Sequence, residues 1–372
     1  MAKHSRPEAQ PAASKKKKKK KSRPLRWLWG LLIALLCIIG LLMAAFGVVL
    51  WKFDLNVFDI LNYNHDKELG GKSDEDLGIS DQTEFSKDVT NIALFGVDSR
   101  SKNSFNGNTD SIMIISIDQV HNKVKLVSIM RDTLVHLDGY GYAKINSAYA
   151  KGGAELALKT LNQSFNLNIR DYAIVNFIGM MDIIESVGGI DVNVTESERN
   201  DANIHIGSMH NEVGTPKDYI RKAGQQTLNG VQAVAWARIR HVSTADGMSD
   251  DYGRTDRQRY VMEQLFNKAL SAGKSQYPAM IKALLPYTQT SLDYGEILSL
   301  AGILTGNIAF EQSRVPLTEY QISGDFRDRT GSSTVYYDLQ YAGKVIHAFI
   351  YDDKKPEDFI AENGVEKNRW AG

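Results

Sequence analysis

The chain has 372 residues, 43% of them hydrophobic and 24% charged, which is enough apolar material for one large domain or two small ones. Its net charge of zero is split, because residues 1–26 carry eleven lysines and arginines against one glutamate, and the rest of the chain carries an excess of acidic groups. The single cysteine, Cys37, excludes an intrachain disulfide, and one cysteine with scattered histidines argues against a zinc site.

An uncharged apolar run follows the basic segment, from residue 27 to residue 51. It is longer than the roughly 20 residues that a helix needs to cross a bilayer, and Trp27, Trp29 and Trp51 stand at its ends. It is too long for the core of a signal peptide, and no small-residue cleavage pattern follows it. We therefore expect an uncleaved transmembrane helix, with residues 1–26 in the cytoplasm and everything after residue 51 outside the cell membrane.

The lysine run at residues 15–21 has a second reading, because such runs also bind nucleic acid or direct nuclear import. Next to a membrane span, control of topology and attraction to anionic lipids explain it better, so we expect the membrane as a partner and no nucleic acid. The outer part contains no cysteine, which fits a bacterial surface better than a eukaryotic secreted domain.

The predicted elements begin after a polar extracellular spacer at residues 52–85. A domain at 86–352 opens with strands at 91–97, 111–117 and 123–129, the last two joined by a tight turn. Gly152-Gly153 then opens a helix at 154–165.

Alternation of strands and helices continues beyond this point. We expect strands at 171–177 and 190–194, and helices at 178–187, 230–237, 256–272, 278–285 and 294–305. Residues 335–350 are apolar enough to pack, and residues 353–372 are expected to form a mobile C-terminal tail. The pattern predicts an α/β fold: a central mixed β-sheet with helices on both faces, preceded by one transmembrane helix.

Acidic and basic residues gather at the ends of the first three strands. Asp98 and Arg100 follow the first strand, Asp110 begins the second, and Arg131 and Asp132 follow the third. If the first and third strands run in one direction and the second against them, these residues share one edge of the sheet. Two carboxylates with guanidinium groups suit a phosphate ester held by a divalent metal, although turn residues are the simpler reading of either aspartate alone.

A second basic cluster lies later, where five arginines fall within 22 residues. Arg254, Arg257 and Gln258 are spaced to share one face at the start of a helix, and a helix N-terminus attracts anions. The alternative is a solvated helix surface, in which aspartates at 250, 251 and 256 pair with these arginines.

A resemblance to a known family connects these clusters. The ordered segments GVDSR, NTDSIMIISID, SIMRDT, KINSAYAKGG, VGGIDV, LNGVQAVAWARIR and DDYGRTDRQR resemble the LytR-CpsA-Psr family. The similarity runs from about residue 90 to 265 and more weakly to about 350, and the basic segment and single span are also similar to that family.

The resemblance implies a Gram-positive cell-wall phosphotransferase with an α-β-α fold. Such an enzyme would move an anionic glycopolymer (teichoic acid, capsule or a similar chain) from a polyprenyl-pyrophosphate carrier to a sugar hydroxyl of peptidoglycan, through a phosphodiester bond. By the same resemblance, Asp98, Asp110 and Arg131 would be catalytic, and Asp98 and Asp110 would hold Mg²⁺, with Mn²⁺ as a substitute. The apolar sheet interior would take the prenyl chain. The pyrophosphate-binding residues would be Arg100, Arg131, Lys144, Asn146, Arg238, Arg240, Arg254, Arg257 and Gln258.

Several positions depart from the family pattern. Asn108 replaces an arginine that often precedes the Thr-Asp pair, which puts one phosphate contact in doubt. Met130, Ser147 and Trp236 stand where proline, histidine and tyrosine are more usual. Either Asp132 or Asp251 could deprotonate the attacking hydroxyl, and both could equally be partners of arginines.

Two other functions use the same residues. One is a non-enzymatic envelope regulator of the transcription-attenuator type, which binds prenyl phosphates. Against it, the lysine-rich cytoplasmic segment contains no DNA-binding module. The other is a polyprenyl-pyrophosphate phosphatase, which would direct water onto the phosphorus. The sequence leaves the glycopolymer and the oligomeric state open.

Overall fold

The computed structural model describes residues 63–365, apart from 82, 84, 100, 102–103, 245–246, 273–274, 276, 304–307, 318–319 and 329. The expected cytoplasmic segment, the expected span at 27–51 and Arg100 therefore lie outside the described residues. Within the described part, no helix is both long enough and apolar enough to cross a membrane.

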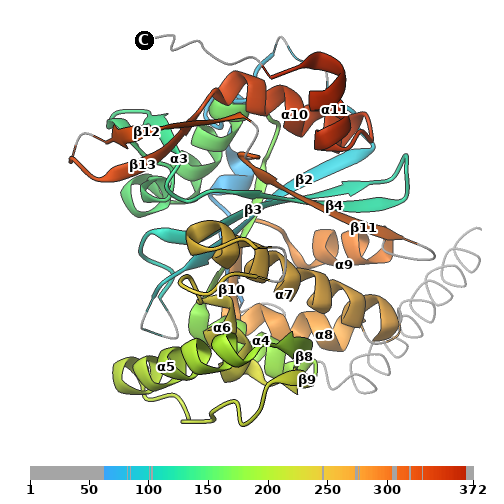
Figure 1. Cartoon of the computed structure of the whole chain (residues 1–372). Coiled ribbons are helices and arrows are strands. Elements are labelled where there is room, and N and C mark those ends of the chain that lie inside the picture. The colour runs from blue at the N-terminus through green and yellow to red at the C-terminus, as the bar shows by residue number, and fades with distance from the viewer. Residues whose placement is uncertain are drawn as a thin grey trace, which may run out of the picture. The chain divides into compact units, whose positions relative to one another are not determined.

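A seven-stranded mixed sheet forms the centre of the domain (Figure 1). Strands β2 and β4 run in one direction and β3 runs against both, which is the condition under which the strand-end residues share one edge, while β7 and β11 are parallel to β2 and β4, respectively. The three strands expected first are found in place. In spatial order the strands are β1 (Asn64–His65), β10 (Thr288–Thr290), β7 (Asp171–Asn176), β2 (Val89–Val97), β3 (Thr109–Asp118), β4 (Lys123–Ile129) and β11 (Ala309–Val315).

Helices cover both faces of this sheet, which confirms the predicted layering. Figure 1 shows α3 (Ser147–Phe165), α10 (Leu339–Tyr351) and α11 (Pro356–Asn363) above the sheet. Below it lie α4 (Phe177–Ser186), α5 (Glu196–Val213), α6 (Gly230–Ala237), α7 (Asp250–Ala272) and α8 (Tyr277–Leu284). The other elements are η1 (Leu69–Gly71), η3 (Leu285–Tyr287) and α9 (Tyr294–Ile303), with hairpins β5 (Leu134–Leu137)–β6 (Gly141–Lys144), β8 (Ile190–Val194)–β9 (Gly224–Leu228) and β12 (Gln321–Arg327)–β13 (Ser333–Tyr337).

Strand alternation sends the two faces of the sheet to different neighbours. On β2, Phe95 and Val97 are buried in a core shared with α3 and α10, while Leu94 and Gly96 point to the other side. A second apolar cluster joins α4, α5, α6 and the β8–β9 hairpin around Ile206 and Trp236. The sheet face that carries Leu94 is therefore turned away from the core shared with α3 and α10, and the second cluster packs separately from that core.

Several elements differ from the sequence-based expectations. Strand β8 has the expected bounds, but it pairs only with β9 and lies outside the central sheet. Helix α7 begins at Asp250, six residues before the expected start, with two aspartates in its first turn, where a helix favours negative charge. The expected tail contains the helix α11, and Phe359 and Ile360 of this helix pack against the main core.

Helix α5 was not expected because its sequence is polar. Only a narrow stripe faces the second core, with Ala202, Ile206 and Met209 buried. A capping box, in which Thr195 and Glu198 exchange hydrogen bonds, starts the helix and was the available sequence signal.

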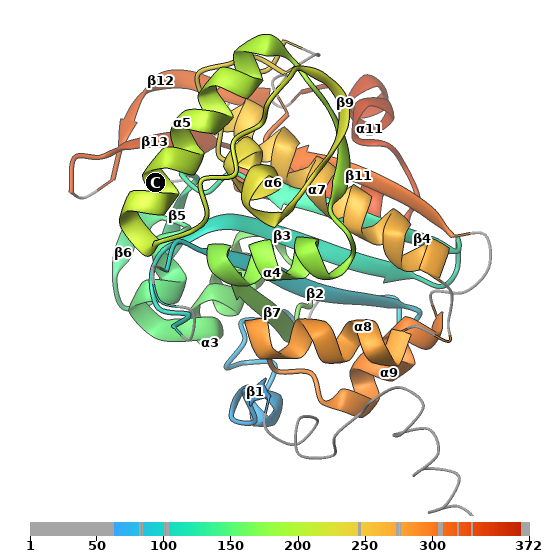
Figure 2. The ribbon, with the colours of Figure 1, turned by 90° about the horizontal axis from the view of Figure 1, so that it is seen from below.

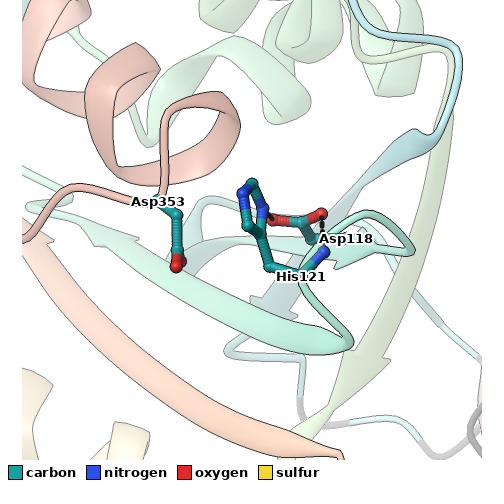
Figure 3. A group of neighbouring side chains, drawn as sticks. All are labelled: Asp118, His121 and Asp353. Carbon is teal, nitrogen blue, oxygen red and sulfur yellow. Dashed lines mark hydrogen bonds and ion pairs between the residues drawn. The ribbon is translucent and has the colours of Figure 1, made fainter.

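A buried ion cluster closes the opposite end of the sheet, at the β3–β4 turn. Lys125 is fully buried and donates to Asp118 at 2.7 Å and to the carbonyl of Ile350 at 3.0 Å. Figure 3 shows Asp118 with His121, whose Nδ1 lies 2.7 Å from the carboxylate, and Asp353 beside them. Burial would raise the pKa of Asp118, but the contacts with Lys125 and His121 outweigh it and hold that pKa below its usual value.

Replacing Lys125 with methionine should lower the free energy of unfolding by about 3–5 kcal/mol, because it leaves the buried Asp118 carboxylate without its ammonium partner. Lys123→Met is the matched control, since Lys123 is partly exposed and pairs with Glu311 and Asp353 at the surface. Urea denaturation at neutral pH measures both. Equal losses in the two variants would contradict this account.

Candidate functional site

The predicted strand-end residues meet at one edge of the sheet. Asp98 directly follows β2, Asp110 lies at the start of β3, and Arg131 follows β4. The pairing of Val97 with Thr109 and of Ile112 with Ile129 fixes this arrangement. An ion pair between Arg131 and Asp110 joins the second and third motifs, and an Arg238 nitrogen lies 3.7 Å from Asp98.

A cavity of about 830 Å³ extends from this edge, between the sheet face that carries Leu94 and the helices below it. Its floor is formed by small or apolar residues of the strands, including Leu94, Gly96 and Ala173. The opposite wall comes from α4, α6, α7 and α8, and its apolar lining includes Met180, Ile183, Ile184, Val234, Val261, Met262, Leu265, Ala269, Met280 and Leu284.

The charged and strongly polar residues of the cavity gather at one end. Its lining contains Asp98, Asp110, Arg131, Arg238, Arg240, His241, Arg254 and Gln258. The site thus combines a long apolar chamber with a basic mouth, and it brings together most of the residues expected to bind pyrophosphate.

Asp251, at the start of α7, holds three of the arginines. One of its carboxylate oxygens lies 3.1 Å from Arg254, 3.4 Å from Arg240 and 3.9 Å from Arg131. Burial would raise the pKa of Asp251, but Arg254, Arg131 and Arg240 together lower it. Asp251 is therefore ionised and already surrounded by arginine side chains, which suits a partner of these arginines better than a general base.

Arg254 lies close to two other guanidinium groups. Burial, together with repulsion from Arg131 and Arg240, lowers the pKa of Arg254 to about 10 despite the attraction of Asp251. Among the described atoms, Nε of Arg254 and Nε of Arg131 are buried without a hydrogen-bond partner. Buried donors of this kind favour a bound anion, which would both accept their hydrogen bonds and offset the repulsion.

Changing Arg254 to glutamine should weaken the binding of inorganic pyrophosphate about tenfold or more, because a charge-assisted hydrogen bond is lost. Isothermal titration calorimetry with the full chain measures the affinity. Arg221→Gln removes the same charge from an exposed position outside the cavity lining and should leave the affinity unchanged. An unaltered affinity in the Arg254 variant would show that this guanidinium does not reach the anion.

The residues expected to hold Mg²⁺ have suitable chemistry. Asp98 and Asp110 both line the basic end of the cavity, and their side chains are 42% and 35% exposed, so carboxylate oxygens remain accessible beside their arginine partners. Two carboxylates completed by phosphate oxygens and water form the donor set that Mg²⁺ usually takes.

Three expected ligands lie elsewhere. Lys144 is just outside the cavity lining, 3.1 Å from Asp132, which also approaches Nε of Arg131 at 3.7 Å. Asn146 is buried, and its backbone donates to Arg131 and accepts from Thr109, so it ties two of the motifs together.

Arg257 points away from the cavity toward α5. It is 1% exposed, donates to Glu198 at 2.9 and 3.0 Å, and also contacts the carbonyls of Ile239 and Val242. A helix of 3.6 residues per turn separates Arg257 from Arg254 by about 60° around the axis. This rotation places Arg257 in the second core, where it fixes the segment that carries Arg238 and Arg240.

Arg257→Met and Glu198→Met should each lower the free energy of unfolding by about 3–5 kcal/mol, because each leaves one buried charge unpaired. The double variant should lose less than the sum of the two single losses. Chemical denaturation gives the coupling energy. Additive losses would mean that the ion pair does not connect α5 to α7.

Two residues of the site were not expected from the sequence. His205 of α5 and His241 both line the cavity beside the arginines. Burial lowers the pKa of His205, and Arg238 and Arg240 lower it further against the pull of Asp201. His205 was missed because α5 itself was not recognised.

Comparison with known proteins confirms the resemblance. Residues 60–343 match the profile of the LytR_cpsA_psr family. The polyisoprenyl-teichoic acid–peptidoglycan teichoic acid transferase TagU of Bacillus mycoides is 31% identical over 269 residues, which cover 72% of this chain and 80% of TagU. The regulatory protein MsrR of Staphylococcus aureus is 32% identical over 213 residues, 57% of this chain and 59% of MsrR.

The fold also matches solved structures. One is YwtF (TagT) of Bacillus subtilis with bound octaprenyl pyrophosphate lipid, with a TM-score of 0.51 and 21% identity over 72% of this chain and 93% of that one. At this identity the likeness establishes the fold alone.

Proposed function

Because the chain belongs to the LytR-CpsA-Psr family, we propose that it is a phosphotransferase that moves an anionic glycopolymer from a polyprenyl-pyrophosphate carrier onto peptidoglycan. The observation that carries this proposal is the cavity, in which one long apolar chamber ends at clustered guanidinium groups and two carboxylates. An amphiphile with a long hydrocarbon chain and a diphosphate head matches that division of chemistry.

The relatives support the proposal. TagU is named as a transferase of teichoic acid to peptidoglycan, and the TagT structure holds an octaprenyl pyrophosphate lipid. The apolar wall of α4, α7 and α8 would enclose the prenyl chain, and Arg131, Arg238, Arg240 and Arg254 would bind the two phosphates.

The transfer forms one bond and breaks one. A sugar hydroxyl oxygen of the acceptor attacks the phosphorus that carries the glycopolymer, the bond from that phosphorus to the bridging oxygen breaks, and polyprenyl phosphate leaves with the bonding electrons. The hydroxyl proton passes to solvent or to a nearby basic group. Because phosphoryl transfer has a loose transition state, positioning and charge stabilisation by the arginines supply most of the catalysis.

Asp98 and Asp110 would hold the metal ion in this scheme, with Mg²⁺ favoured and Mn²⁺ a substitute. When bound, the ion would neutralise charge that develops on the phosphate oxygens. Asp110 has a second task, because its ion pair keeps Arg131 directed at the same phosphate.

A lipid-linked donor is confined to the membrane, so the proposal includes the single span at residues 27–51, with the domain on the outer side of the cell membrane. The span would hold the cavity close to the surface from which the prenyl chain must enter.

Asp98→Ala and Arg131→Ala should each lower the transfer rate by about 100-fold or more, since the first removes a ligand of the metal ion and the second a guanidinium group that stabilises phosphate charge. The assay supplies Mg²⁺, a lipid-pyrophosphate-linked sugar and peptidoglycan oligomers, and mass spectrometry identifies the phosphodiester product. Asp358→Ala, an exposed change on α11, is the control, and EDTA should abolish transfer.

The same assay separates the alternatives. Release of free sugar phosphate without product would identify a phosphatase. Tight lipid binding without turnover by the folded wild-type chain would favour a regulator instead.

A further inference from the structure

The β5–β6 hairpin has one buried face and one open face. Val135 and Leu137 are fully buried in the main core, while His136 and Tyr142 lie on the outer side. These two residues are directly opposite each other across the hairpin, with ring centroids 5.5 Å apart in an edge-on arrangement. Tyr142 is 47% exposed, although a large aromatic side chain gains from burial.

This open face is continuous with the reaction site. The next cross-strand pair on the same face is Leu134 with Lys144, and Lys144 binds Asp132 at 3.1 Å. The hairpin thus starts three residues after Arg131, and Tyr142 lies two residues from Lys144, about 7 Å along the strand.

A second hairpin adds aromatic rings next to the first. Val335 of β13 donates to the carbonyl of Asp132 at 2.8 Å and bridges to Thr133, so β12–β13 lies beside β5–β6 (Figure 2). The rings of Phe326 and Tyr336 are 4.4 Å apart. Tyr336 directly follows Val335 in β13, so it lies at the junction between the two hairpins.

His136, Tyr142, Phe326 and Tyr336 therefore form an aromatic platform at the surface, next to the basic mouth of the cavity. Partly exposed aromatic rings with polar neighbours suit pyranose sugars, whose C–H faces stack on rings while their hydroxyls bind polar groups. We propose that this platform binds the acceptor glycan strand, a β-linked chain of amino sugars, and positions its hydroxyl at the phosphorus.

The direction of attack assigns the platform to the acceptor, given the proposed function. The leaving polyprenyl phosphate occupies the cavity on one side of Arg131. In-line displacement places the attacking oxygen opposite the leaving oxygen. Lys144 contacts Asp132 beside Arg131, and no residue of the β5–β6 hairpin lines the cavity, so the hairpin borders the site from outside the chamber that would hold the leaving group.

The chain offers a matched pair of tyrosines for the test. Tyr140 belongs to the same hairpin and is 46% exposed, but its hydroxyl donates to the Lys151 carbonyl at 3.1 Å and the Lys151 ammonium lies 4.8 Å from its ring. Tyr140 thus faces α3 and lies outside the platform. The variants are Tyr142→Ala, Tyr142→Phe and, as the control, Tyr140→Ala.

Transfer kinetics of the full chain in nanodiscs, with the peptidoglycan oligomer varied at saturating lipid donor, give the acceptor KM. Tyr142→Ala should raise it roughly fivefold to tenfold, the size expected for loss of one stacking ring, while the donor KM stays unchanged. Tyr142→Phe, which keeps the ring, and Tyr140→Ala should behave like the wild type.

Two results would overturn the assignment. An unchanged acceptor KM in Tyr142→Ala would show that the platform does not bind the acceptor, and a raised donor KM would mean that the rings hold the sugars of the donor polymer.

If the wild type transfers nothing, the proposed function fails, and the platform is then tested separately by NMR titration with a donor-free peptidoglycan tetrasaccharide. If the ring signals of Tyr142 in the wild type do not shift during this titration, the platform does not bind the acceptor.

Discussion

The repulsion among guanidinium groups at the end of the sheet is the constraint on which the site depends. Arg131 comes from the end of β4, more than 100 residues before Arg240 and Arg254, and all three converge on one carboxylate, that of Asp251. Asp110 and Asp132 also lie against Arg131, yet among the described atoms Nε of Arg131 and Nε of Arg254 remain buried without a hydrogen-bond partner. The fold tolerates these unpaired donors because well-packed cores on either side hold the segments in place.

Much of this arrangement could be predicted from sequence because it follows from strand order. Once β2, β3 and β4 alternate in direction, Asp98, Asp110 and Arg131 must share an edge, and each lies next to an apolar run that marks its strand. Gly188 and Gly189 follow α4 and both adopt positive φ angles, so the end of this helix also agrees with a common role of glycine.

What could not be predicted depends on helix rotation and on polar elements. Arg254 and Arg257 belong to one short motif, yet one turns into the cavity and the other into an ion pair with Glu198, because α5 packs on that side. Since α5 has little apolar periodicity, neither its existence nor the position of His205 could be read from hydrophobic spacing. Tertiary contacts determined both outcomes.

Helix α7 has a geometric consequence for the whole site. The same straight element supplies Arg254 at the charged end of the cavity and Ala269 far along its apolar wall. Fifteen residues of helix span about 22 Å, and a helix does not stretch. The distance between the anion-binding groups and the far wall is therefore fixed by the helix. Once the charged end of an occupant is bound, this fixed length limits how much of its apolar chain the chamber can hold.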